Sequence, residues 1–252
     1  MRNRVSAAAL SLLTVVTLAV TARVSAQSAT STDLTGVWTN NPPENTRAFQ
    51  NYSFSIDPPK MTDWGQAAFN ANKPNRGERA VPVADSDDPV YDCFPPGTPR
   101  IYFHPFPMEI VQSADRVLMI FEYDHLIRQV YTDGRDHRSD LAPSWMGDST
   151  GHWEGDTLVV ETVNFNEKSW LDRRGVPHSE GLRVIERIRV NDDGQLQIDI
   201  TMDDPVALVE PWIGQRFYRK TDWNIEEFVC MDNVNFESFE NSVLEYEGEA
   251  AD

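Results

Sequence analysis

The chain has 252 residues, with 22 Lys+Arg against 40 Asp+Glu, and so carries a net charge of −18. Hydrophobic residues make up 40% of the chain and charged residues 25%, which is typical of a globular protein and not of a disordered one. The acidic balance disfavours binding to nucleic acids or anionic membranes, because both require clustered Lys and Arg. The 16 Pro and 13 Gly indicate a turn-rich chain and disfavour a helix bundle.

Residues 1–26 have the features of a secretory signal peptide. Arg2 and Arg4 form a basic start, residues 6–22 are uncharged, and Val24-Ser25-Ala26 is a small-residue cleavage site. We expect the mature chain to begin at Gln27 and to be periplasmic or extracellular. No later segment has the roughly 18 apolar residues of a membrane helix, so no membrane insertion is expected after signal removal. An uncleaved signal anchor is the alternative.

Residues 33–100 are rich in Pro and are expected to be largely irregular. They open with a predicted short strand around Leu34–Thr39. Thr62 is a good N-cap for a helix over Asp63–Asn70, and Lys73-Pro74 should end that helix. Residues 85–92 contain four aspartates, which we interpret as a solvated acidic loop because their spacing does not fit an EF-hand calcium loop.

From Ile101 onward the pattern predicts antiparallel strands joined by short turns. The expected strands are Met108–Gln112, Val117–Thr132, Gly151–Trp153, Thr157–Phe165, Leu182–Val190, Gln195–Met202, Arg216–Lys220 and Trp223–Cys230. A mainly β fold follows, in which an antiparallel meander closes into a lipocalin-like β-barrel with one or two short helices. Residues 27–252 should form this single domain, with main strands over 101–233 and an acidic tail over 234–252.

The two cysteines, Cys93 and Cys230, are expected to form a disulfide, because an exported protein folds in an oxidising compartment. A pair of free buried thiols is the alternative. Two cysteines so far apart are a poor zinc signature.

Carboxylates interrupt the apolar faces of several predicted strands. The pattern places Glu122, Glu161, Glu186, Glu227 and Arg128 on inward faces. Because Glu is rarely buried without a partner, several such residues in one barrel indicate a polar ligand cavity. The alternative is that these faces are wet, with Arg128 simply paired to Glu122.

The segment Trp170–Glu180 holds a dense group of reactive side chains at a predicted barrel rim. His178 is suited to acid/base chemistry, with Asp172 or Glu180 to orient it. The structural alternative is that Asp172 and Ser179 cap turns and His178 packs on the rim. A serine nucleophile is disfavoured because no Gly-x-Ser-x-Gly sequence is present.

No metal and no cofactor are expected. The five histidines form neither His-x-His nor His-x-x-x-His, and no Gly-x-Gly-x-x-Gly, P-loop or Cys-x-x-Cys-His sequence occurs. A metal site assembled from distant strands remains the alternative.

Four segments carry a resemblance to a known family: Asp33–Trp38, Tyr131–Arg135, Gly151–Val160 and Pro177–Glu180. The first looks like the Gly-x-Trp opening strand of lipocalin-like barrels. Together they resemble a family of secreted, mostly uncharacterised bacterial proteins, over nearly all of residues 33–233. The resemblance implies a lipocalin-like barrel and export, and it brings no catalytic residues with it.

Our leading hypothesis is a cofactor-independent enzyme that uses general acid/base chemistry on a small, partly aromatic molecule in the barrel. Hydrolysis or elimination, including ether cleavage, would suit such a site. The residues expected to act on the substrate are Glu186, His178, Glu122 and Asp172, and those expected to bind it are Arg128, His125, Tyr123, Trp170, Glu161 and Glu227. The rival is a periplasmic binding or carrier protein without catalysis. Homo- or hetero-oligomers are compatible with either.

Overall fold

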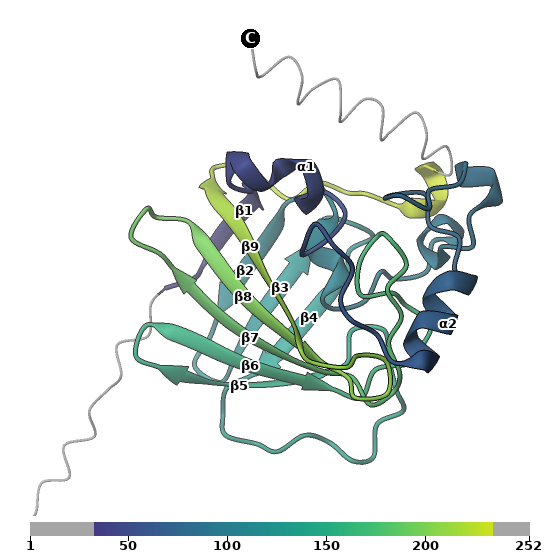
Figure 1. Ribbon diagram of the computed structural model, residues 1–252. Helices are drawn as coiled ribbons and strands as arrows, with labels where there is room; N and C mark the ends of the chain where they lie inside the picture. Colours follow the sequence, from purple (N-terminus) through teal and green to yellow (C-terminus); the bar gives the residue numbers. More distant parts are fainter. Residues whose placement is uncertain (1–32, 234–252) are drawn as a thin grey trace, which may run out of the picture.

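Nine strands close into one β-barrel in the computed structural model, which describes residues 33–233 (Figure 1). The strands are β1 Gly36–Asn40, β2 Met108–Gln112, β3 Arg116–Phe121, β4 Ile127–Tyr131, β5 Asp148–Glu154, β6 Thr157–Val163, β7 Arg183–Val190, β8 Leu196–Asp203 and β9 Trp212–Thr221. Each strand pairs with the next along the chain, and β9 returns to β1. The predicted mainly β barrel is confirmed. The predicted signal peptide and the acidic tail lie outside the described residues.

The barrel departs from a pure meander at one place, because β4 and β5 are parallel. Val130 lies opposite Ser149 and Tyr131 opposite Thr150. Two parallel neighbours cannot be joined by a tight hairpin, so the chain must cross over between them. Residues 132–147 make this crossover, and they bring a loop against the outside of the barrel.

The irregular N-terminal region packs against one end of the barrel (Figure 1). It contains α1 Arg47–Gln50 and α2 Asp63–Ala71. As predicted, Thr62 caps α2 by accepting a hydrogen bond from the Gly65 amide at 3.1 Å. The 3-10 helices of the region are η1 Glu44–Thr46, η2 Val83–Asp85, η3 Pro89–Asp92 and η4 Arg100–Phe103.

The barrel interior is filled mainly by apolar side chains from the strands and from η4. Ile101, Tyr102 and Phe103 are all buried, and Tyr102 reaches into the barrel to hydrogen-bond Glu186. Phe103 also packs at a tilt against Phe54, with ring centroids 4.4 Å apart, and Phe54 lies over Gly214 of β9. The N-terminal region therefore closes one end of the barrel and supplies part of its core.

Two of the predicted strands are wrong in detail. The expected strand Val117–Thr132 is two strands, because Asp124 and His125 take positive φ angles of 53° and 52° and turn the chain back. Residues 223–229 form a loop, followed by the 3-10 helix η5 Cys230–Asn233. In consequence Glu122 and Glu227 do not lie on strand faces.

The face of β6 is the reverse of the prediction. Leu158, Val160 and Thr162 are buried, so Val159 and Glu161 point outward. Valines occur on both faces of this strand, and its sequence pattern therefore did not distinguish inside from outside. The face of β7 is as predicted, with Val184, Glu186 and Ile188 buried.

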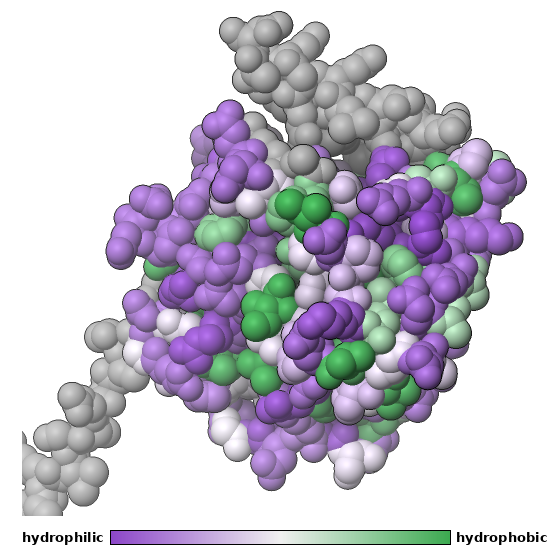
Figure 2. Space-filling model, viewed as in Figure 1, coloured by the Kyte–Doolittle hydropathy of each residue, from purple (hydrophilic) through white to green (hydrophobic). Residues whose placement is uncertain are grey.

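The surface in the Figure 1 orientation is mostly hydrophilic, with small separated apolar groups (Figure 2). Among residues 33–233 no helix has the length and apolar character needed to cross a membrane.

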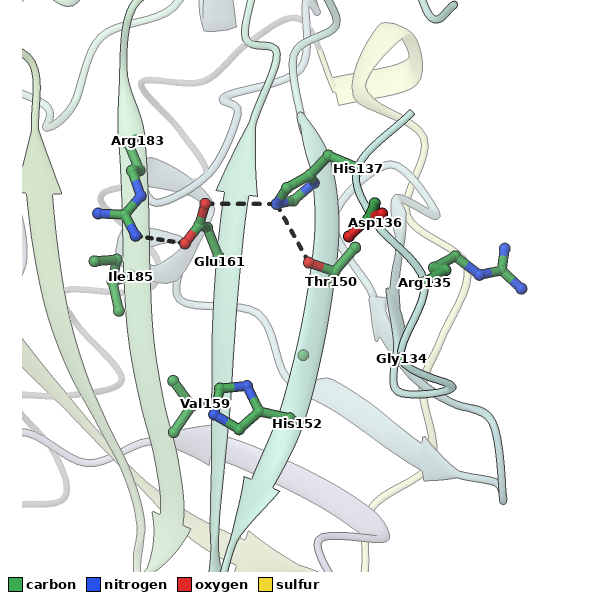
Figure 3. A pocket seen from close by; sticks show the side chains of 11 residues that line it. Gly134, Arg135, Asp136, His137, Thr150, His152, Val159, Glu161, Arg183 and Ile185 are labelled. Atoms are coloured by element: carbon green, nitrogen blue, oxygen red, sulfur yellow. Dashed lines mark hydrogen bonds and ion pairs between the residues drawn. The ribbon is translucent and has the colours of Figure 1, made fainter. Parts of the chain in front are cut away.

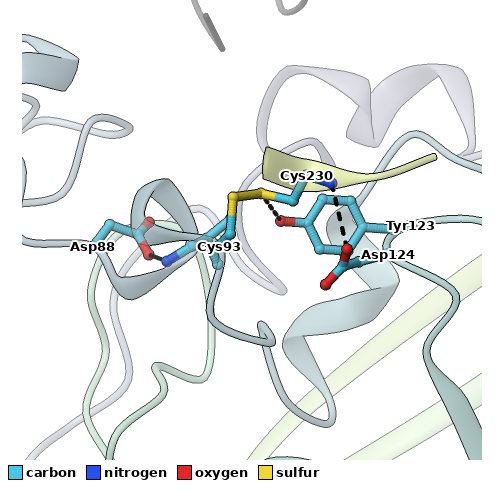
Figure 4. The surroundings of a disulfide bond; sticks show 6 residues. Asp88, Cys93, Tyr123, Asp124 and Cys230 are labelled. Atoms are coloured by element: carbon cyan, nitrogen blue, oxygen red, sulfur yellow. Dashed lines mark hydrogen bonds between the residues drawn. A yellow bond between two sulfur atoms is a disulfide. The ribbon is translucent and has the colours of Figure 1, made fainter. Parts of the chain in front are cut away.

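The predicted disulfide is present. Cys93 and Cys230 are joined across a sequence separation of 137 residues, with their Cα atoms 5.6 Å apart (Figure 4). The Tyr123 hydroxyl lies 3.7 Å from Cys230 Sγ. The bond therefore fastens η5 to the segment that follows η3.

The Cys93→Ser/Cys230→Ser double variant should lose about 3–5 kcal/mol of unfolding free energy, since the bond restricts a long loop in the unfolded chain. Urea unfolding of the oxidised protein and of the double variant measures the difference. Equal stabilities would contradict a structural role for the bond.

Candidate functional site

Glu186 lies inside the barrel in a closed hydrogen-bonded network. Its carboxylate forms a bidentate salt bridge with Arg128, in which Nη1 donates to Oε1 at 2.9 Å and Nη2 to Oε2. It also accepts a 2.7 Å hydrogen bond from the Tyr102 hydroxyl. Arg128 also donates to Thr162 Oγ1 at 2.7 Å and to Ser149 Oγ at 3.1 Å. Glu186 and Arg128 are 0% and 2% exposed. The surrounding hydroxyls satisfy the pair, which is what a buried charge requires.

This network favours the charged form of Arg128 and the neutral form of Tyr102. Burial opposes the positive charge of Arg128, but the adjacent Glu186 carboxylate outweighs burial and raises the pKa of Arg128. Burial and the same carboxylate raise the pKa of Tyr102, which therefore stays a neutral donor. These contacts fit a structural role for Glu186 better than that of an acid open to substrate.

His178 and Asp172 are held by the loop before β7. His178 Nε2 lies 2.9 Å from Ser169 Oγ and Nδ1 lies 3.0 Å from the Ser179 carbonyl oxygen. Burial lowers the pKa of His178. Asp172 accepts from the Arg174 and Val176 amides at 2.9 and 3.2 Å and pairs with the Arg174 side chain. Both residues thus stabilise their own loop.

The other predicted site residues are spread over several surroundings. Glu122 accepts a hydrogen bond from the Glu226 amide at 3.0 Å, and burial raises the pKa of Glu122. Tyr123 is buried against His104, with ring centroids 4.2 Å apart, whereas His125 and Glu227 are exposed.

Trp170 is buried beneath the guanidinium of Arg100. Apart from the Glu186–Arg128 pair, the structure does not join these residues into one hydrogen-bonded site.

An open groove does exist, on the outside of the barrel. It has a volume of about 410 Å³ and lies between the crossover loop and the outward side chains of β5, β6 and β7 (Figure 3). Its lining is Gly134, Arg135, Asp136, His137, Thr150, Gly151, His152, Val159, Glu161, Arg183 and Ile185. The strand register places Thr150, Glu161 and Ile185 side by side across β5, β6 and β7, because Thr150 lies opposite Glu161 and Glu161 opposite Ile185. Of the predicted site residues, Glu161 lines this groove.

His137, on the crossover loop, is the central group of the groove. Its Nδ1 lies 2.9 Å from Asp148 Oδ2, and its Nε2 lies 3.2 Å from Thr150 Oγ1 and 3.7 Å from Glu161 Oε1. Asp148 is 8% exposed and also accepts from the Arg138 amide at 3.1 Å. A carboxylate at Nδ1 favours the tautomer with the proton on that nitrogen, so the Nε2 lone pair faces Thr150 and the groove.

Glu161 is held as an anion beside the ring. Arg183 donates to it at 2.5 Å, and this hydrogen bond lowers the pKa of Glu161 (Figure 3). Farther along the strands, His152 lies 3.2 Å from Glu154 and Arg187 donates to Glu154 at 2.8 Å. Two carboxylates, Asp148 and Glu161, therefore flank the ring of His137.

Sequence reasoning missed His137, Asp148 and Thr150 as a group. His137 stands in the charged run Asp133–Asp140, which has the composition of a solvated loop. The sequence shows His137 eleven residues before Asp148, which starts β5. This spacing brings the two side chains together only because β5 runs parallel to β4, and the sequence pattern did not predict that pairing.

Within residues 33–233 no three His, Cys, Asp or Glu side chains are grouped to hold a metal ion. No family model matches the chain, and no curated protein matches its sequence. The geometry of the groove therefore carries the functional argument.

The Arg128→Met change should lower the unfolding free energy by about 3–5 kcal/mol, because it leaves the Glu186 charge buried without its partner. Adding Glu186→Leu should recover most of that loss, since no unpaired charge then remains. Urea unfolding of the two single variants and the double variant tests this. A double variant as unstable as the sum of the singles would contradict the pairing.

The stability of the protein should fall as pH drops below about 6.5, the ordinary pKa of histidine. Burial lowers the pKa of His178 and of His104 in the fold, so the unfolded chain binds more protons in this range. His178→Gln should reduce the loss between pH 7.5 and 5, whereas the exposed His125→Gln should leave it unchanged. An unaltered pH profile in His178→Gln would contradict the assignment.

Proposed function

We propose that the protein is a cofactor-independent enzyme whose general base is His137, acting in the outer groove. The carrying observation is the Asp148–His137 pair, with Nδ1 on a nearly buried carboxylate and Nε2 toward the open groove. Asp148 orients the ring, and Glu161 adds negative charge beside the nitrogen that takes the proton. A histidine whose ring is oriented by a carboxylate in this way is suited to act as a general base.

The groove suits a small molecule with an apolar body and a negative group. Val159 and Ile185 supply apolar surface, and Arg183, which pairs with Glu161, supplies a cationic group. The guanidinium of Arg135 is directed away from the groove and pairs with Asp133 (Figure 3). The imidazoles of His137 and His152 offer flat faces for an aromatic ring. An aryl ester or aryl ether that carries a carboxylate has these features.

Two reactions fit a single base. In hydrolysis, His137 takes a proton from water, the water oxygen bonds to the acyl carbon, and the aryl oxygen leaves with the bonding electrons. In elimination, His137 takes a proton from the carbon next to a carbonyl, a carbon–carbon double bond forms, and the C–O bond to the aryl group breaks. The protonated ring can return its proton to the leaving oxygen in either case.

The test uses two chromogenic probes, 4-nitrophenyl hydrogen glutarate for hydrolysis and 4-(4-nitrophenoxy)butan-2-one for elimination. The protein should accelerate release of 4-nitrophenolate from at least one probe, and EDTA should not abolish the rate. His137→Gln should lower turnover by ~100-fold or more, the usual size of a general-base contribution. Asp148→Asn should also lower it, because the ring loses its orienting charge.

The Arg128→Met/Glu186→Leu double variant is the matched control, since it alters the interior pair and leaves the groove intact. It should keep the rate of the unaltered protein. A rate that depends on Glu186 and not on His137 would overturn the proposal and return the chemistry to the interior. Binding of both probes in the groove without turnover would favour the carrier function.

A further inference from the structure

Thr150 is the one residue with a hydroxyl group among the described residues that line the groove. Its Oγ1 lies 3.2 Å from His137 Nε2, and the two side chains point toward one another (Figure 3). Within residues 33–233, Thr150 Oγ1 has no other hydrogen-bond partner. Thr150 is half-buried on β5 and lines the groove, so a molecule bound there can reach its hydroxyl.

The neighbouring hydroxyls on β5 and β6 face the interior of the barrel. Ser149 Oγ and Thr162 Oγ1 accept hydrogen bonds from Arg128 and lie 2.9 Å from each other. Because side chains alternate along a strand, Thr150 lies on the opposite face from Ser149. The strand therefore presents a single hydroxyl to the groove, next to the imidazole.

Asp148, His137 and Thr150 form a chain of hydrogen bonds. Asp148 Oδ2 lies 2.9 Å from His137 Nδ1 and favours the proton on that nitrogen, so the Nε2 lone pair can accept the proton of the Thr150 hydroxyl. A hydroxyl within hydrogen-bond reach of a base, with a third group that orients the base, is the arrangement of an activated nucleophile. The 3.2 Å separation is at the upper end of that reach, which is common before substrate binds.

We propose that Thr150 is the nucleophile of ester hydrolysis and carries the acyl group as a covalent ester. The step rests on the proposed general-base function of His137 and puts Thr150 in the place of the attacking water. His137 Nε2 takes the proton of Thr150 Oγ1, and Oγ1 bonds to the acyl carbon. The aryl oxygen then leaves with the bonding electrons and takes the proton from His137. The carbonyl oxygen is negative in between, and Arg183 is a cationic donor in the same groove.

Water enters in the second step. His137 takes a proton from water, and the water oxygen bonds to the acyl carbon of the Thr150 ester. Thr150 Oγ1 then leaves with the electrons of its bond and recovers a proton from His137. The two steps together consume the ester and one water and yield a carboxylic acid and a phenol, so no other reactant is required.

The experiment treats the mature protein with 4-nitrophenyl hydrogen glutarate, quenches with acid during turnover, and locates any glutaryl ester by peptide mass spectrometry. The ester should lie on the peptide that contains Thr150 and should be absent from His137→Gln. Thr150→Val keeps the shape of the side chain without its hydroxyl. This variant should carry no ester and lose ~100-fold or more in turnover, since the covalent path is removed. Thr150→Ser should retain both the ester and turnover.

Thr221→Val is the matched control, because Thr221 is a half-buried threonine on β9, outside the groove. It should keep the turnover and the ester of the unaltered protein. A second measurement serves if Thr150→Val fails to fold or if the acyl group is lost too fast to be trapped. With methanol as a competing acceptor, the 4-nitrophenyl and 4-chlorophenyl esters should give one ratio of methyl ester to free acid, because both pass through the same acylated protein.

Turnover that requires His137 but is unchanged in Thr150→Val, with no ester on the protein, would overturn the covalent step and leave His137 acting on water. A product ratio that differs between the two leaving groups, or an ester on another residue, would overturn the covalent step as well. Turnover of the elimination probe alone would have the same consequence. Release of 4-nitrophenolate from neither the ester nor the ether probe would overturn the proposed function itself, and the covalent step with it.

Discussion

The parallel pairing of β4 with β5 is the constraint on which the candidate site depends. A hairpin between these strands would have kept residues 132–147 at the end of the barrel. The crossover that parallel strands require instead carries His137 along the outside, to Asp148 and Thr150 of β5. The groove lies between that loop and the outward side chains of β5, β6 and β7. One irregularity in the meander therefore creates both the hollow and the catalytic geometry proposed for it.

The interior of the barrel has a different role. Glu186 and Arg128 neutralise each other there, and Tyr102, Ser149 and Thr162 complete their hydrogen bonds. Tyr102 comes from η4, so the pair also links the N-terminal region to the barrel core. A buried ion pair adds little net stability over an apolar replacement, yet it strongly penalises any arrangement that separates its partners. We interpret this one as fixing how η4 enters the barrel.

The sequence was sufficient for the barrel, for helix α2 with its Thr62 cap, and for the disulfide. Period-two alternation predicted β7 correctly because its outer face carries Arg183, Arg187 and Arg189. The same alternation predicted the wrong inner face for β6, because valines lie on both faces of that strand. It also predicted one continuous strand through Asp124 and His125, where the chain turns back without any Gly or Pro. The site was harder to predict because its parts meet only through the crossover and the strand register. Glu161, which was predicted to bind substrate inside the barrel, lies on the outer side of the sheet and lines the groove.

We propose that small molecules bind at the outer groove and not inside the barrel. Histidine-selective ¹⁵N NMR of the mature protein, titrated with 3-phenoxypropionate as a non-reacting aryl ether carboxylate, tests it directly. We expect the ¹⁵N resonances of the His137 ring to shift with added ligand, and those of His152 to shift less. The resonances of the buried His178 and His104 should stay unchanged. Shifts at His178 or His104 with His137 unchanged would instead place the ligand inside the protein and rule out the outer groove.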